Sequence, residues 1–242
     1  LSEVEVSKYI SKLEETGEID NTLILFLSDN GASSERPSKY GPGFDRAGST
    51  RDGKKVNFPV NKDSLAGSQT TLSGIGPQWA HTANTPFKYY KAKVYEGGIN
   101  TPFIAYWPNG GLKNGTVISS PAHVSDVMAT CIDVAQGKYP TEYNGNKITP
   151  TPGKSIIPIL RGTQTEGTQE IFFWEHFGSN AIRKENWKLV KLDINSPWEL
   201  YDISKDRTEI NNVAEEHPEV VANLQKEWLV EANVYKALPA PN

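Results

Sequence analysis

The stretch 22–31, with the sequence TLILFLSDNG, limits the possible folds more than any other part of the chain. Its residues 23–27 are all apolar, so an extended strand here is apolar on both faces. That pattern is typical of a strand buried in a parallel sheet that helices cover on each side. The run stops at 28–31, where all the residues favour a turn. The stretch therefore predicts an α/β protein with this turn at the carboxyl end of a central strand.

Asp29 and Asn30 stand where open α/β sheets bind their ligands, in the crevice at the carboxyl ends of the strands. A carboxylate beside a side-chain amide offers two hard oxygen donors, which suit Ca²⁺ or Mg²⁺. The same residues are also typical of an ordinary turn in which an Asx side chain bonds its own backbone. The residues alone leave both interpretations open.

Size and charge exclude several classes of protein. The 242 residues are enough for one sizeable core with at most a small satellite. The formal net charge is −4, and no basic run indicates a nucleic-acid partner. No apolar stretch approaches the roughly 20 residues of a membrane span. Cys131 is the single cysteine, which excludes an internal disulfide and a cysteine-rich zinc site.

The N-terminal residues predict a helix. Val6, Tyr9, Ile10 and Leu13 follow the spacing of one helix face, and Gly17 is a suitable stop. A helix that leads into a parallel strand is a crossover, and a crossover follows an earlier parallel strand. We therefore expect the chain to start inside a fold, with an N-terminal part missing.

A long polar segment, 32–78, follows the first strand and is either functional or a flexible insertion. Next come three lysines before the glycine pair at 97–98, and a second predicted strand at 103–107. A lysine at a strand-end turn suits an anionic substrate, although most such lysines are simply solvated. Residues 123–135 predict a helix in which Cys131 is a buried hydrophobe and His123 is hydrogen-bonded at the start.

The C-terminal third changes pattern. Short aromatic segments at 169–177, 181–192 and 198–203 predict an antiparallel meander. A polar connector follows at 205–212, and Pro218 then opens a helix. These elements predict a small satellite after the main α/β body.

The ordered series of motifs points to one family. In chain order the motifs are SDNG, NTPFKYYKAKVYEGGINTPFIAYWP, HVSDVMATCIDVA, PGKSIIPILRG, AIRKENWKLV and WELYDISKDRTEINNVAEEHPEVV. Together they resemble the C-terminal half of a formylglycine-dependent (type I), arylsulfatase-like sulfatase of the alkaline-phosphatase superfamily. The resemblance implies an α/β sandwich with a mostly parallel central sheet, partial here, and a small C-terminal antiparallel sheet with a terminal helix. Residues 1–165 would belong to the catalytic domain and 166–242 to the C-terminal α+β subdomain.

The resemblance also implies roles for a few residues. Asp29 and Asn30 match the pair that supplies two calcium ligands in sulfatases, with Ca²⁺ expected rather than Mg²⁺. Lys91 matches the lysine that binds the sulfate oxygens and stabilises the transferring group. His81, which we expect in a loop that faces the site, is a candidate for substrate contact. A dication and a lysine placed in advance would stabilise the charge that develops during sulfate ester cleavage.

The chain lacks the Cys/Ser-x-Pro-x-Arg motif from which the family makes its formylglycine nucleophile. The resemblance therefore implies that the nucleophile and the remaining pocket residues lie in an N-terminal half, without which this chain does not hydrolyse sulfate esters. The substrate would be a sulfated small molecule or glycan, and the location periplasmic or extracellular by analogy with exported relatives. A phosphatase or phosphodiesterase of the same superfamily, and a non-catalytic glycan-binding remnant, stay open as alternatives.

Overall fold

The structure is a computed structural model that describes residues 3–36, 48–57 and 67–238. The chain divides into two compact units, each built from two stretches of sequence. Unit 1 contains the stretch that ends at Ser28 and the stretch Pro102–Phe172, and unit 2 contains Asp29–Thr101 and the part from Phe173 onward. The predicted domain limits, 1–165 and 166–242, remain a prediction. Within the described ranges, no helix has the length and apolar character needed to cross a membrane.

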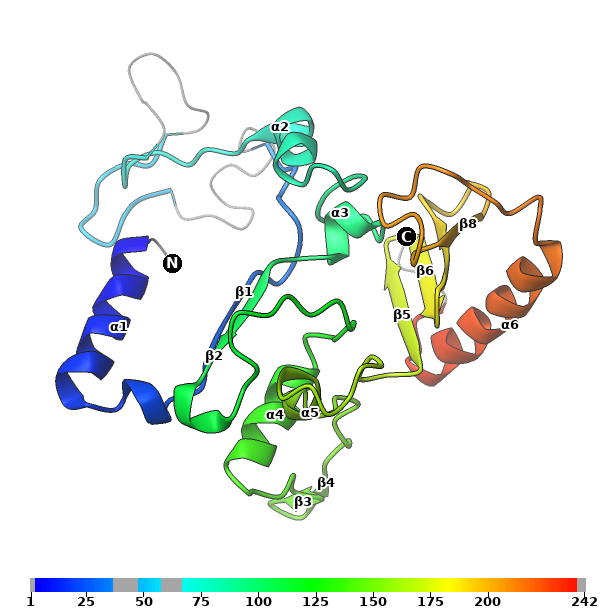
Figure 1. The fold of residues 1–242 in the computed structure, drawn as a ribbon. Helices are drawn as coiled ribbons and strands as arrows, with labels where there is room; N and C mark the ends of the chain where they lie inside the picture. Colours follow the sequence, from blue (N-terminus) through cyan, green and yellow to red (C-terminus); the bar gives the residue numbers. More distant parts are fainter. Residues whose placement is uncertain (1–2, 37–47, 58–66, 239–242) are drawn as a thin grey trace. The chain divides into compact units, whose positions relative to one another are not determined.

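Unit 1 begins with the predicted N-terminal helix and the first strand. Its elements, drawn in Figure 1, are α1 (Glu3–Thr16), the 3₁₀ helix η1 (Ile19–Asn21), β1 (Ile24–Leu27), β2 (Phe103–Tyr106), the 3₁₀ helix η3 (Pro108–Gly110), α4 (Asp126–Val134), β3 (Glu142–Tyr143), β4 (Asn146–Lys147) and α5 (Ile157–Leu160). The helix at the N-terminus and the strand predicted at 103–107 are both confirmed. Much of the long polar segment that follows β1, namely 37–47 and 58–66, lies outside the described residues.

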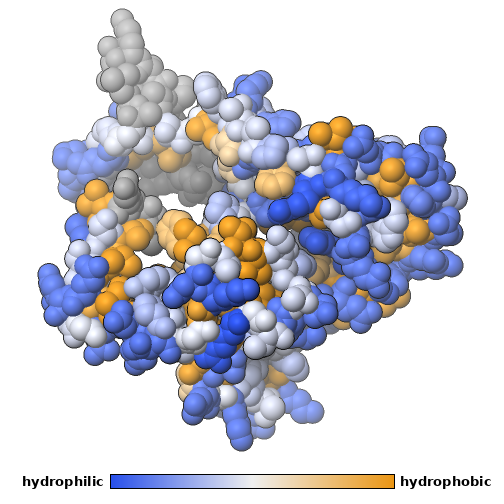
Figure 2. Space-filling view, viewed as in Figure 1, coloured by the Kyte–Doolittle hydropathy of each residue, from blue (hydrophilic) through white to orange (hydrophobic). Residues whose placement is uncertain are grey.

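The pairing of β1 differs from the prediction. β1 pairs with β2 in an antiparallel ribbon, in which Ile24 lies opposite Tyr106 and Leu27 opposite Phe103. The ribbon is partly exposed, and Figure 2 shows hydrophobic side chains at its surface. An apolar run indicates that both faces of a strand favour burial, but it does not fix the direction of the neighbouring strand. The sequence therefore located this strand correctly and its pairing wrongly.

Helix α4 buries a polar face. It starts at Asp126, and its buried residues are Asp126 and Thr130, whereas Cys131 is exposed. The prediction that Cys131 is a buried hydrophobe was wrong. The Asp126 carboxylate accepts hydrogen bonds from the amides of His123 (2.7 Å) and Lys154 (2.9 Å), and these bonds turn the polar side of the helix inward. The predicted hydrogen bond of His123 is present, between its Nδ1 and the Ser125 hydroxyl at 2.9 Å.

Unit 2 contains the predicted C-terminal meander. Its helices are α2 (Gly76–Ala83), α3 (Glu96–Ile99) and α6 (Pro218–Val234). Its four-stranded sheet has the strand order β5 (Ile171–His176), β6 (Ser179–Lys184), β7 (Trp187–Lys191) and β8 (Glu199–Asp202). The first residues of β5 belong to unit 1. The segment 181–192 of the predicted meander contains two strands and not one, because the chain turns at Glu185, where φ is +53°. Helix α6 buries Leu224 and Trp228, as its spacing predicts.

Candidate functional site

Backbone hydrogen bonds place the Asp29–Asn30 turn beside the segment that carries Lys91. The amide of Gly31 donates to the carbonyl of Gly98 at 2.9 Å, and the amide of Lys91 donates to the carbonyl of Ala32 at 3.1 Å. Lys91 therefore lies next to the turn in space, although about sixty residues separate them in sequence.

Glycines make this arrangement possible, because they let backbone segments meet without side chains between them. A Cβ atom built on Gly31 would lie 1.8 Å from the carbonyl oxygen of Gly97. A Cβ on Gly98 would lie 1.8 Å from the Lys93 carbonyl oxygen, and one on Gly97 would lie 2.3 Å from the Lys88 carbonyl oxygen. All three contacts are far closer than a real Cβ allows. The glycine pair of the YEGG motif therefore serves as the contact surface between the turn, α3 and the lysine segment.

The Asp29 and Asn30 side chains are suited to a hard cation but do not complete a site. Asp29 is exposed, and the Asn30 amide nitrogen donates to the Gly31 carbonyl at 2.9 Å, which fixes the plane of the amide. These two side chains alone therefore cannot supply the six to eight oxygen ligands that Ca²⁺ takes. In the part of the chain that the structure describes, no group of three or more His, Cys, Asp or Glu side chains could hold a metal ion. The two side chains are hard oxygen donors of the kind that suits a calcium ion, and they could supply only part of its ligands.

Lys91 forms an exposed ion pair. Its Nζ lies 3.4 Å from Oε1 of Glu35, and the two side chains are 38% and 39% exposed. The other carboxylate oxygen of Glu35 accepts a hydrogen bond from the Ser33 hydroxyl at 2.9 Å. Because water screens this pair, an anionic ligand could take the place of Glu35 on the lysine.

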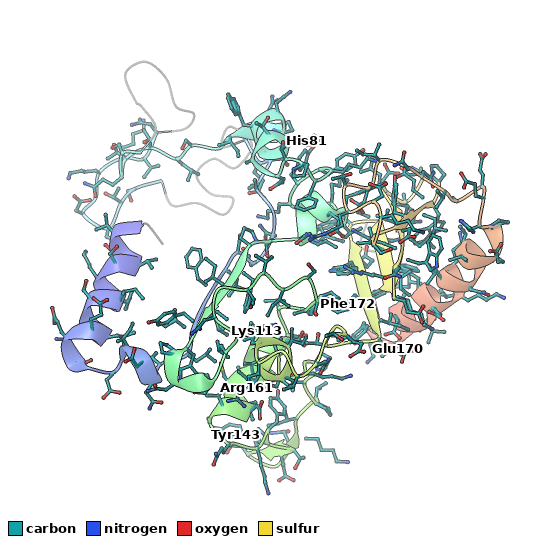
Figure 3. The ribbon with its side chains drawn as sticks, viewed as in Figure 1. His81, Lys113, Tyr143, Arg161, Glu170 and Phe172 are labelled. Carbon is teal, nitrogen blue, oxygen red and sulfur yellow. The ribbon has the colours of Figure 1, made fainter. Side chains whose placement is uncertain are left out.

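His81 lies in the last turn of α2 and not in a loop, so that expectation was wrong (Figure 3). Its ring stacks on Tyr89, with 6.3 Å between ring centroids and 18° between planes. The helix forms because Pro77 stands in its first turn, a position that prolines favour, and no interrupting glycine or proline follows before Asn84.

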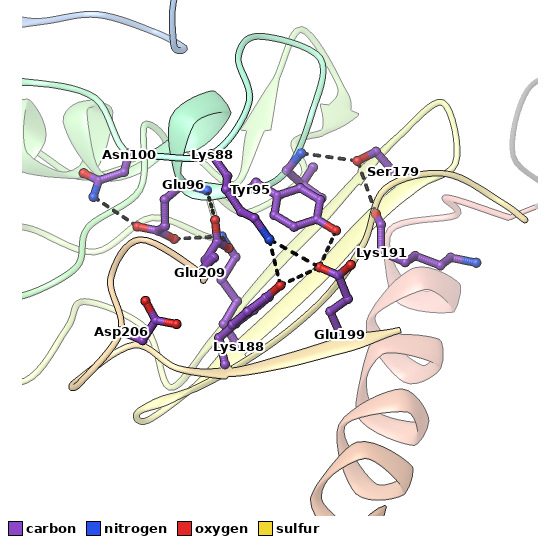
Figure 4. A network of polar contacts seen from close by, with 12 residues as sticks. Lys88, Tyr95, Glu96, Asn100, Ser179, Lys188, Lys191, Glu199, Asp206 and Glu209 are labelled. Atoms are coloured by element: carbon purple, nitrogen blue, oxygen red, sulfur yellow. Dashed lines mark hydrogen bonds and ion pairs between the residues drawn. The ribbon is translucent and has the colours of Figure 1, made fainter. Parts of the chain in front are cut away.

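A buried ionic cluster holds α3 from the side of the C-terminal sheet, and sequence reasoning missed it (Figure 4). Lys188 on β7 is 0% exposed, and its Nζ lies 2.7 Å from the Glu96 carboxylate and 2.8 Å from the Glu209 carboxylate. Glu209 also accepts a hydrogen bond from the backbone amide of Glu96 at 2.7 Å. The far oxygen of Glu96 accepts from the Asn100 side chain at 3.0 Å.

Burial and mutual attraction set the ionisation of this cluster. Burial opposes the charge on Lys188, but the carboxylates of Glu209 and Glu96 outweigh it and raise the pKa of the ammonium. Burial also disfavours the charged form of Glu96, yet Lys188 and then Arg183 hold the pKa of that carboxyl below its usual range. For Glu209, burial is the larger effect and raises its pKa despite Lys188. The three groups therefore act as one coupled unit.

A second polar network anchors the residues before α3. The hydroxyls of Tyr95 and Tyr201 donate to one oxygen of Glu199, at 2.9 and 2.6 Å. Lys88 Nζ donates to the Tyr201 hydroxyl at 3.0 Å and lies over both tyrosine rings. Burial, followed by the hydrogen bond to Glu199, raises the pKa of both phenols, so they remain neutral donors.

The polar connector at 205–212 is also more than a surface loop. The Asp206 carboxylate accepts hydrogen bonds from the amides of Ile210 (2.8 Å) and Asn211 (2.7 Å), which closes the connector into a tight turn. The turn directs Glu209 inward, where it is 0% exposed and has φ +57°. The sequence signal was the aspartate at the start of a polar stretch, which predicts a local turn but not the burial of a neighbouring glutamate.

Comparison with known proteins identifies the family. The sulfatase family model matches residues 5–137, and the model for the C-terminal part of N-sulphoglucosamine sulphohydrolase matches residues 87–233. The chain is a member of the sulfatase family. It is 30% identical over 246 residues to an uncharacterized sulfatase of Schizosaccharomyces pombe, a match that covers 95% of this chain and 41% of the relative.

Two further similarities agree with this assignment. The chain is 31% identical over 159 residues to an arylsulfatase of Klebsiella aerogenes, which covers 65% of this chain and 32% of that protein. Its fold is similar to the crystal structure of Ps i-CgsB, also solved in complex with k-i-k-neocarrahexaose, with a TM-score of 0.61, 23% identity and coverage of 92% and 39%. The predicted alkaline-phosphatase-like α/β fold is confirmed. In each of these three matches, the chain covers less than half the length of the related protein.

Proposed function

We propose that this chain contributes part of the active site of a sulfuric ester hydrolase. Asp29 and Asn30 supply two oxygen ligands to a calcium ion, and Lys91 binds the sulfate oxygens of the substrate. The observation that carries the proposal is the pair of backbone hydrogen bonds that places the Lys91 segment against the Asp29–Asn30 turn. A carboxylate, an amide and an ammonium in one place are what an anionic ester bound to a dication requires.

The chemistry divides between this chain and the rest of the protein. A bound calcium ion would stabilise negative charge on the sulfuryl oxygens. Lys91 would exchange Glu35 for the sulfate group and hold it as a point charge, because its ion pair is solvent-exposed. The formylglycine nucleophile and the further calcium ligands would come from polypeptide outside this chain, since the sequence contains no Cys/Ser-x-Pro-x-Arg motif.

The substrate class follows from the same charges. A dication beside a lysine favours an anionic ester, and the match to the sulfatase family favours a sulfate ester among these. The exposed position of Lys91 leaves room for a sugar or aryl group on the ester. Ps i-CgsB, whose fold is similar, was solved with k-i-k-neocarrahexaose bound, which supports a sulfated glycan as one substrate class. His81 would contact the group that carries the sulfate.

The test replaces neighbouring lysines in the complete protein. Lys91→Met removes the ammonium, and Lys93→Met is the matched control, because the Lys93 ammonium donates to the Leu192 carbonyl at 3.3 Å. With 4-nitrophenyl sulfate as substrate, we expect kcat/KM to fall by about 10²–10³ in Lys91→Met, the usual cost of removing one group that stabilises developing charge. Lys93→Met should keep most of the activity.

Metal content gives a readout that does not depend on turnover. Asp29→Ala should lose bound calcium, measured by elemental analysis after dialysis against calcium buffer, while Lys91→Met keeps it. Unchanged calcium in Asp29→Ala would overturn the metal assignment. A wild-type protein that hydrolyses 4-nitrophenyl phosphate faster than the sulfate would overturn the proposal of a sulfatase.

A further inference from the structure

We propose that Lys188 and Glu209, which lie outside the candidate site, are positioning residues for it. Through Glu96 they fix α3, and α3 in turn fixes both the Asp29–Asn30 turn and the segment of Lys91. The inference rests on the proposed function only for the identity of the ligand. The structural connection from the C-terminal sheet to the Asp29–Asn30 turn is argued only from hydrogen bonds, ion pairs and close backbone contacts, and does not depend on the identity of the ligand.

The first step runs from the sheet to α3. Lys188 holds the side chain of Glu96 at 2.7 Å, while Glu209 holds the backbone amide of the same residue at 2.7 Å and the Lys188 ammonium at 2.8 Å. The first residue of α3 is therefore fixed by both its side chain and its backbone (Figure 4). Charge-assisted hydrogen bonds are short and directional, so they set position in a way that apolar contacts do not.

The second step runs from α3 to the candidate site. Gly97 donates its amide to the Lys88 carbonyl at 2.8 Å, and Gly98 accepts from the Gly31 amide at 2.9 Å. The closest approaches at these glycines leave no space even for a methyl group. A displacement of α3 must therefore displace the turn and the lysine segment with it, because protein interiors have no free volume to absorb the movement.

The composition of the cluster also favours a positioning role. Burying two carboxylates and an ammonium costs desolvation, and well-packed apolar side chains often stabilise a core as well or better. The cluster lies between residues that are 92 and 113 positions apart in sequence, so it joins the sheet and the connector to α3 directly. Beyond packing, the ionic cluster fixes the orientation of the short helix α3.

The experiment uses Glu209→Gln and a matched control in the complete protein. A glutamine at 209 must face either the Glu96 amide or the Lys188 ammonium with its own NH₂ group, so one of the two contacts is lost in either orientation. Glu227→Gln makes the same chemical change in the Lys184–Glu227 ion pair (2.8 Å), which links β6 to α6 and does not touch α3.

Two readouts are taken well below the melting temperature, where both variants are folded. Hydrogen exchange by mass spectrometry follows the peptides that contain 29–32 and 88–93, and calorimetric titration gives the Kd for Ca²⁺. In Glu209→Gln we expect both peptides to exchange about tenfold faster and Ca²⁺ to bind about tenfold more weakly, the size of effect expected for one lost charge-assisted hydrogen bond. Glu227→Gln should leave both values unchanged.

The outcomes separate this inference from the proposed function. Unchanged exchange in both peptides of Glu209→Gln would overturn the positioning role, whatever the melting temperature does. Equal acceleration in Glu227→Gln would also overturn it, because the effect would then be general softening. Faster exchange confined to Glu209→Gln supports the coupling even if Asp29→Ala shows that calcium binds elsewhere, in which case only the proposed metal site fails.

Discussion

Two lysines of unit 2 illustrate two different uses of the same charge. Lys188 is completely buried and contacts two carboxylates at 2.7 and 2.8 Å. Lys91 is 38% exposed and contacts one carboxylate at 3.4 Å. The buried lysine cannot change partner without leaving a charge unpaired in the interior, whereas the exposed one can exchange Glu35 for a ligand. In the proposed arrangement, the buried cluster around Lys188 holds α3 in place, and α3 supports the segment on which Lys91 is exposed to a ligand.

The two lysines also differ in energy. An exposed ion pair contributes about 0–1 kcal/mol, because water screens the charges and the long side chains lose entropy. Removing one partner of a buried pair costs about 3–5 kcal/mol, because the other charge remains buried and uncompensated. The strongly held lysine therefore suits the proposed positioning role, and the weakly held lysine suits the proposed ligand-binding role.

The largest expected effect comes from Lys188→Met compared with Lys91→Met. We expect Lys188→Met to lower the free energy of unfolding by about 3–5 kcal/mol, because Glu96 and Glu209 then lose the buried ammonium that contacts both of them. Lys91→Met should change it by less than about 1 kcal/mol. Urea unfolding of the complete protein, followed by fluorescence of the tryptophans, measures both. Similar losses for the two variants would show that the lysines do not differ as described.

The next largest loss of stability is expected where the backbone of α3 lies against the backbone of the lysine segment. Gly98→Ala places a Cβ 1.8 Å from the Lys93 carbonyl oxygen, so the segments must separate. We expect a loss of about 1–3 kcal/mol, the usual cost of overpacking. In Gly137→Ala, the control, the nearest atom to the new Cβ is the Ile132 carbonyl oxygen at 3.5 Å, an ordinary contact. If Gly98→Ala unfolds at the same urea concentration as Gly137→Ala, the α3 contact is not close in solution.

The alkaline limit of stability provides a test of the charge on Lys188. Its folded pKa is raised above the unfolded value of about 10.4, so its contribution is complete below that pH and disappears as pH rises through the folded pKa. Glu96 and Glu209 are the charged groups that face it. The difference in unfolding free energy between wild type and Lys188→Met should therefore be constant from pH 8 to about 10 and shrink above that. A difference that does not change up to pH 11.5 would contradict the assignment.

The predictable part of the fold was its local part. The meander and α6 were recognised because aromatic segments separated by turn residues, and a proline followed by helical spacing, can be seen in consecutive residues. Helix α6 packs against the sheet through residues such as Trp228. The direction in which β1 pairs depends on a partner about eighty residues away, and no pattern within 22–31 specifies it. The polar face of α4 escaped notice because its reason, the hydrogen bonds of Asp126, lies in other segments.

The candidate site divides in the same way. Asp29, Asn30 and Lys91 could be predicted as site residues because they stand in recognisable motifs, and backbone hydrogen bonds bring their segments together. Their roles stay a prediction. Glu96 and Glu209 were not found as partners of Lys188. Glu209 lies in a polar connector, where a glutamate is ordinarily solvated, and nothing in the YEGG motif indicates that the Glu96 side chain is buried. One signal was available for the third member, Lys188. It lies two residues before the core residue Val190 and therefore on the same face of β7, so a charge on that face should have indicated a buried carboxylate partner.

The smallest expected effect concerns the exchangeable partner of Lys91. Glu35→Gln removes the carboxylate that competes with an anion for the Lys91 ammonium, yet it keeps an acceptor for the Ser33 hydroxyl. Stability should change by less than about 0.5 kcal/mol, since the pair is exposed.

Anion binding should respond more clearly than stability does. If an anion displaces Glu35, the inhibition constant of inorganic sulfate should fall by about two- to fivefold in Glu35→Gln, the factor that corresponds to an exposed ion pair. Glu166→Gln is the control, since it removes one exposed negative charge from unit 1 and leaves Lys91 untouched. A sulfate inhibition constant that stays the same or rises in Glu35→Gln would mean that Glu35 holds Lys91 in place for the anion. In that case the lysine of the site would need a fixed partner, as Lys188 does, and the contrast between the two lysines would be one of exposure alone.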